Sequence, residues 1–243
     1  MPALLPALIA GAGFGGVALA GLAGLRIGPR LRGAAVGVAA GILLAVALAD
    51  LFPEALAEAG AKTASLWFLV GFAVLFVVEV VTRGHTHHEA GEEHVEHSSL
   101  TPFVTGLLLH NFVDGAVLAA GREASAEVGT AIAIGIVVHQ LPVGLSFAAV
   151  VATVPGGRER ARTWAVALGA AIPAGALAVA ALPSLEGAEL GALLAAAGGA
   201  LAYIGAGHLL PEAHSEHPSL SSGALFPASL LGTAVLLLYV IHG

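Results

Sequence analysis

Residues 3–25 read ALLPALIAGAGFGGVALAGLAGL, a stretch of 23 residues without a charged side chain. A helix of this length rises about 35 Å, enough to cross the hydrocarbon core of a bilayer. Similar apolar runs recur along all 243 residues, and the composition is 58% hydrophobic and 10% charged. Soluble domains are about 45–50% apolar even with glycine counted. The sequence therefore predicts a polytopic membrane protein.

The apolar runs are separated by stretches rich in glycine, proline or charge, which mark the ends of membrane spans. We expect eight transmembrane helices at 3–25, 34–56, 64–82, 100–120, 126–152, 163–183, 189–211 and 224–242. Eight spans take about 160 residues, so no soluble domain of ordinary size fits beside them. The predicted fold class is all-α, with residues 1–243 forming a single transmembrane domain.

Charge excludes several classes of function and predicts an orientation. The net charge is -7, with nine lysines and arginines spread along the chain, so we expect no nucleic-acid partner. The absence of cysteine excludes disulfides and thiolate metal sites. One arrangement of the loops places seven arginines in the cytoplasm: Arg26, Arg30, Arg32, Arg83, Arg158, Arg160 and Arg162. Because only Lys62 and Arg122 then lie outside, both termini are predicted outside the cytoplasm.

Two pairs of similar strings suggest an internal repeat. DLFPEA at 50–55 closes the second predicted span, and HLLPEA at 208–213 closes the seventh, on the opposite side of the membrane. HNFVDG at 110–115 and HQLPVG at 139–144 lie near the middle of the fourth and fifth spans. Inverted repeats with polar groups at the membrane midplane are the layout of secondary transporters.

The midplane strings supply a candidate metal site. His110 and Asp114 are four residues apart and share one helix face, and His139 offers a third ligand from the next span. Imidazole and carboxylate without sulfur suit Zn(II) and its neighbours Fe(II), Mn(II), Co(II), Ni(II) and Cd(II). The alternative is that the three side chains only hydrogen-bond to one another between helices.

Three further polar clusters are candidate cation sites, and two of them have an alternative interpretation. The loop at 84–98, GHTHHEAGEEHVEHS, contains five histidines and four glutamates, typical of a flexible cytoplasmic metal-collecting loop or of a solvated linker. The inner end of the seventh span carries His208, Glu212, His214, Glu216 and His217, which could exchange a cation on that side. The outer end of the second span carries Asp50, Glu54 and Glu58, either a cation-attracting mouth or ordinary solvated acids.

The midplane strings, the histidine-rich loop and HLLPEA together resemble the ZIP (Zrt-, Irt-like protein) family of divalent metal transporters, over essentially the whole chain. The resemblance implies uptake of Zn(II) or a related divalent cation, as transported substrate and not as cofactor, from outside into the cytoplasm. It also implies a 3+2+3 inverted-repeat bundle in the plasma or bacterial inner membrane, an elevator mechanism and a homodimer. The remaining partners are the metal ion and the lipid bilayer.

The chain departs from the family pattern where the family usually has carboxylates, at Gln140, Val143 and Ile172. We therefore expect a single-metal site of His110, Asp114 and His139, with Asn111 and Gln140 as neutral helpers. Three protein ligands and a water also describe a catalytic zinc, so an intramembrane zinc hydrolase is an alternative. The HExxH motif is absent, and we expect no enzyme. A metal-sensing membrane protein is the other alternative.

Overall fold

The computed structural model describes residues 4–24, 29–84, 100–124, 126–182, 185–211, 213 and 220–241. These residues are almost entirely helical and include no strand. The helices are α1 (Leu4–Gly24), α2 (Pro29–Val46), α3 (Phe52–Gly84), α4 (Leu100–Ala124), α5 (Ala126–Thr153), α6 (Gly157–Ala180), α7 (Ala188–Ala202) and α9 (Leu220–Leu236). Three π-helical segments continue α2, α7 and α9, namely η1 (Ala47–Leu51), η2 (Tyr203–Leu209) and η3 (Leu237–Ile241). The predicted all-α class is confirmed.

The second and third predicted spans are separated by a kink inside α3. The segment η1 follows α2 directly, and α3 starts at Phe52 and continues to Gly84. Pro53 fits this start because the first helical turn tolerates proline. Gly60 interrupts α3 with φ 72° and ψ 164°, a conformation that favours glycine. Two helices therefore meet at Gly60, inside the stretch 57–63 that the predicted bounds leave between these spans.

The described helices have the length and surface of membrane spans. Five apolar stretches among them are long enough to cross a bilayer: Leu4–Ala23, Gly33–Val78, Phe103–Arg122, Gly157–Ala180 and Ala188–Gly207. Large apolar side chains also face outward, such as Leu66 and Leu69 on α3 and Leu231 on α9. Such exposure is unfavourable in water and favourable against lipid. The chain is a polytopic membrane protein.

The many small residues let helix backbones touch, as their abundance suggests. A Cβ atom on Gly115 of α4 would overlap the carbonyl oxygen of Ile172 on α6. A Cβ atom on Gly71 of α3 would overlap the carbonyl oxygen of Ala196 on α7. Helix association in lipid depends on such close packing, because lipid tails are as apolar as the side chains.

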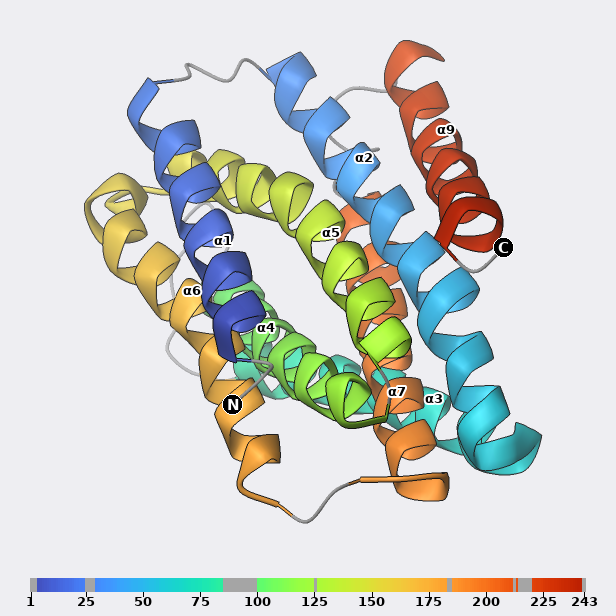
Figure 1. Ribbon diagram of the computed structural model, residues 1–243. Helices are drawn as coiled ribbons and strands as arrows, with labels where there is room; N and C mark the ends of the chain where they lie inside the picture. Colours follow the sequence, from blue (N-terminus) through green and yellow to red (C-terminus); the bar gives the residue numbers. More distant parts are fainter. Residues whose placement is uncertain are drawn as a thin grey trace.

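The eight helices of the described chain form two groups of four (Figure 1). Helices α1, α4, α5 and α6 pack against one another and are called the first helix group. Helices α2, α3, α7 and α9 form the second helix group, together with the π-helical segments η1, η2 and η3 that continue them. The groups meet where α5 lies against α2 and α4 lies against α7. The polar side chains of interest lie near this boundary.

Candidate metal site

Three polar side chains of α4 lie inside the bundle. His110 and Asp114 are four residues apart on one helix face, and Asn111 follows His110 directly. Their exposed fractions are 1% for His110, 0% for Asn111 and 3% for Asp114. An ionisable group buried at membrane depth is costly unless polar partners surround it. The burial of these side chains therefore requires an explanation from their contacts.

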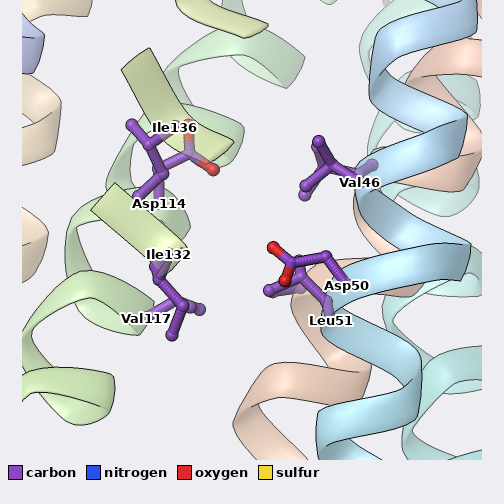
Figure 2. A pocket seen from close by; sticks show the side chains of 9 residues that line it. Val46, Asp50, Leu51, Asp114, Val117, Ile132 and Ile136 are labelled. Carbon is purple, nitrogen blue, oxygen red and sulfur yellow. The ribbon is translucent and has the colours of Figure 1, made fainter. Parts of the chain in front are cut away.

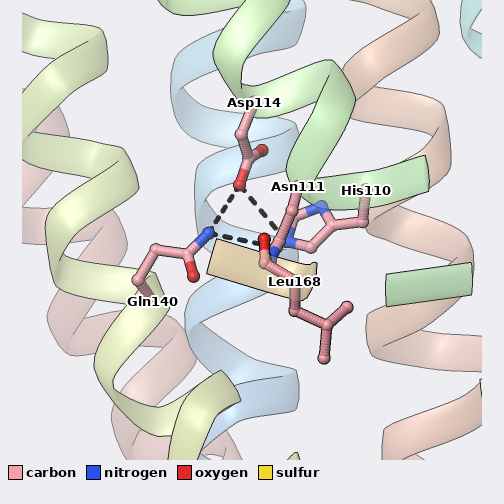
Figure 3. A network of polar contacts seen from close by, with 5 residues as sticks. All are labelled: His110, Asn111, Asp114, Gln140 and Leu168. Carbon is pink, nitrogen blue, oxygen red and sulfur yellow. Dashed lines mark hydrogen bonds and ion pairs between the residues drawn. The ribbon is translucent and has the colours of Figure 1, made fainter. Parts of the chain in front are cut away.

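A polar network joins these side chains to two neighbouring helices (Figure 3). The amide nitrogen Nε2 of Gln140 on α5 donates to Asp114 Oδ2 at 2.9 Å and to Asn111 Oδ1 at 3.3 Å. Asn111 Nδ2 donates to the carbonyl oxygen of Leu168 on α6 at 2.9 Å. His110 Nε2 lies 3.4 Å from Asp114 Oδ2. Gln140 and His110 therefore both lie at the same carboxylate oxygen of Asp114, and Gln140 donates to it.

The network is rich in acceptor oxygens. Gln140 is 3% exposed, and its oxygen Oε1 has no hydrogen-bond partner within the described part of the chain. The Gln140 nitrogen Nε2 donates to oxygens of Asp114 and Asn111, and these two bonds fix which end of the amide is nitrogen and which is oxygen. A buried acceptor without a donor costs about 1–3 kcal/mol. A cation is one partner that would satisfy such an oxygen.

The predicted trio is only partly described. His110 and Asp114 come together as expected, and the neutral helpers Asn111 and Gln140 belong to the same network. His139 lies in α5 beside Gln140, but its side chain is outside the described residues. Among the side chains that are described, no three histidines or acids come together in a group that could hold a metal ion. Ligation by all three residues stays a prediction.

The position of Asp50 differs from the expectation of a solvated outer acid. It lies in η1 and is 4% exposed, whereas Glu54 and Glu58 on α3 are half-buried. Helix continues past Asp50 through η1 into α3, so the residue lies deeper than the end of a span. The internal repeat could have singled out Asp50, because it aligns Asp50 with His208 and both residue types bind metals.

Asp50 and Asp114 line the same small cavity (Figure 2). Its volume is about 10 Å³, close to the smallest space that holds one water molecule. The rest of its wall consists of valine, leucine, isoleucine and alanine side chains from α2, η1, α4, α5 and α7. Figure 2 shows the two carboxylates on opposite walls, each directed into the gap. One acid comes from each helix group.

Two predicted clusters lie outside the described residues. The histidine-rich loop at 84–98 is one, apart from Gly84 at the end of α3. The second is the set of side chains His208, Glu212, His214, Glu216 and His217. Both remain predictions.

A family model described as ZIP zinc transporter matches residues 101–239, more than half of the chain. The chain belongs to the ZIP zinc transporter family. No curated protein matches the chain. The matched region runs from α4 into η3 and contains every residue of the polar network. Members of the ZIP family move divalent metals across membranes and are transporters rather than enzymes, so divalent metal transport is the function of this multi-pass protein.

Two positions where the ZIP resemblance leads one to expect acids are part of the apolar core. Val143 on α5 is 1% exposed, and Ile172 on α6 is 0% exposed. The backbone of Ile172 is in close contact with α4 at Gly115. Side chains of this kind supply no metal ligand. Gln140, the third such position, supplies a neutral amide to the network.

Proposed function

We propose that this ZIP protein carries divalent cations, zinc foremost, into the cytoplasm through one site made by His110, Asp114 and His139. The observation that carries the proposal is the buried contact of His110 with an Asp114 carboxylate that Gln140 orients. One anionic oxygen ligand beside imidazole is a ligand set that suits Zn(II). Asn111 and Gln140 act as neutral helpers: Gln140 donates to the carboxylate, and Asn111 accepts from the same amide nitrogen.

We propose that this site takes a single metal ion. A second ion beside the first would need further negative charge, since two dications repel strongly in a low-dielectric site. The apolar side chains of Val143 and Ile172 provide none, and Gln140 is neutral. The ligands on α4 and α5 therefore suffice for one ion only.

We infer a 3+2+3 inverted repeat from helix contacts that occur in matched pairs. The two strings that end in Pro-Glu-Ala are offset by 158 residues, and the same offset relates Gly41 to Gly199 and Phe68 to Phe226. A Cβ atom on Gly41 would meet the carbonyl oxygen of Phe226. A Cβ atom on Gly199 would meet the carbonyl oxygen of Phe68. Each contact is therefore the image of the other.

A second matched pair involves the two middle helices. The histidine strings of α4 and α5 are offset by 29 residues, which relates Gly115 to Gly144. Gly115 is in close contact with the carbonyl oxygen of Ile172, and Gly144 lies against that of Phe14. Phe14 and Ile172 are again 158 residues apart. Such pairs are expected if a pseudo-two-fold axis in the membrane plane relates the halves.

We propose that the first helix group moves relative to the second as an elevator that carries the cation. The supporting observation is that the polar network lies wholly on α4, α5 and α6, within the first group. A homodimer is proposed on the resemblance alone. A plasma or bacterial inner membrane location is likewise proposed on the resemblance. The proposed orientation, with both termini outside, is supported by the arginine distribution, which includes the exposed Arg158, Arg160 and Arg162 at the start of α6.

Metal uptake by the purified protein in liposomes tests this function. We expect zinc uptake by the wild type, and a loss of at least about tenfold in His110→Ala, because even outer-shell partners of a metal contribute about 10- to 100-fold. Leu109→Ala is the matched control, since Leu109 precedes His110 on α4 and is 37% exposed. Equal uptake by both variants would refute the site. Absence of uptake by the folded wild type would refute transport.

A further inference from the structure

The cavity between the helix groups has two acids and an otherwise apolar wall. Asp50 belongs to η1 of the second group, and Asp114 belongs to α4 of the first. Both are at least nine-tenths buried and both face the cavity (Figure 2). The network in Figure 3 fixes Asp114 from the side of Gln140 and His110. Asp114 therefore stands between the polar network and the cavity.

Two carboxylates across a small apolar cavity favour a cation between them. Like charges in a medium of low dielectric repel each other, and an ion of opposite charge compensates both. A cavity of about 10 Å³ has room for a dehydrated metal ion and none for a hydration shell. Protein oxygens would then replace the water ligands, and the carboxylates of Asp50 and Asp114 supply such oxygens to this cavity.

The backbone at Asp50 is also unusual. Ala47–Leu51 form a π-helical turn between α2 and α3. Such turns are rare, and they occur frequently at functional sites because the wider turn changes the direction of side chains. In this chain the turn carries a buried acid on the boundary between the two helix groups.

We propose that Asp50 is a direct ligand of the transported cation and completes its site together with Asp114. The proposal rests on the function proposed above and adds the residue that sets ion preference. Two carboxylates give the site a formal charge of -2, which matches a divalent cation. Asp50 thus supplies, from a different helix, one carboxylate to a chain that has none at Gln140, Val143 and Ile172.

Asp50 should favour Mn(II) relative to Zn(II). Carboxylate oxygens suit harder cations such as Mn(II), whereas Zn(II) is also held well by imidazole. Removal of one carboxylate therefore weakens the site more for Mn(II).

Uptake of Mn(II) and of Zn(II), each offered alone to protein in liposomes, tests the proposal. We expect Asp50→Asn to lower Mn(II) uptake at sub-saturating concentration by at least about tenfold, since loss of one partner of a buried charge contact is strongly destabilising. Zn(II) uptake should fall less. Glu189→Gln is the matched control, because it removes an exposed charge from α7, a helix that also lines the cavity.

Two outcomes would overturn the role of Asp50. The first is Mn(II) uptake in Asp50→Asn equal to that of Glu189→Gln. The second concerns Asp50→Glu, which keeps the charge and should retain most of the Mn(II) uptake. If this variant loses as much Mn(II) uptake as Asp50→Asn, the role of Asp50 is wrong. Asp114→Asn separates the two proposals. If it abolishes uptake while Asp50→Asn does not, only the role of Asp50 fails; if neither variant affects uptake, the proposed site fails as a whole.

Discussion

Asp114→Asn removes the charge of the proposed site and preserves its shape. Asparagine has the size of aspartate and keeps one side-chain oxygen. Gln140 Nε2 lies 2.9 Å from Asp114 Oδ2 and can donate to that oxygen in the variant. Because the two side chains have the same size, we expect the helix contacts around α4 to be kept in the variant. The variant therefore isolates the contribution of the negative charge to metal binding.

The magnitude follows from burial. Asp114 is 3% exposed, so solvent screens its charge very little. Removal of one partner from a buried ion pair costs about 3–5 kcal/mol. Each 1.4 kcal/mol corresponds to a factor of about ten in an equilibrium constant. We therefore expect the Kd for Zn(II) to rise by at least about 100-fold.

The assay is competition for Zn(II) between purified protein and a chelator of known affinity. Residues 85–97 are deleted in every sample, since the histidine-rich loop would bind zinc by itself. Glu159→Gln removes an exposed acid near the start of α6 and serves as the charge control. A rise in Kd below about fivefold would refute our account of Asp114. Such a change corresponds to less free energy than one hydrogen bond to a charged group contributes.

Three further predictions concern stoichiometry, packing and the loop. The protein without residues 85–97 should hold one Zn(II) per chain by elemental analysis, because Val143 and Ile172 offer no carboxylate; two ions per chain would contradict the single-metal site. Gly115→Ala should lower the free energy of unfolding by about 1–3 kcal/mol through overlap with α6, whereas Gly106→Ala, with open space at its Cβ, should not destabilise; equal thermal stability in detergent would argue against this packing. Deletion of residues 85–97 should leave zinc uptake by liposomes active, and a complete loss would favour a sensor or an obligatory loop.

The sequence alone predicts much of the architecture because a bilayer imposes simple rules. Every polar backbone group must be satisfied within the span, so apolar runs of about 20 residues become helices. The spans expected at 100–120 and 126–152 accordingly fall on α4 and α5. The break expected between the second and third spans falls at Gly60, where two helices meet at a kink, whereas the π-helical turn η1 before Pro53 is a feature that composition does not predict.

Local spacing likewise determines part of the site, and tertiary structure decides the rest. His110 and Asp114 meet because residues four apart share a face of any α-helix, whatever surrounds it. Contact between Gln140 and Asp114 requires α5 to pack against α4, and the depth of Asp50 requires α2, η1 and α7 to close around it. Spacing along the chain does not predict such pairs, because Asp50 and Asp114 are 64 positions apart and their separation in space depends on the packing of whole helices.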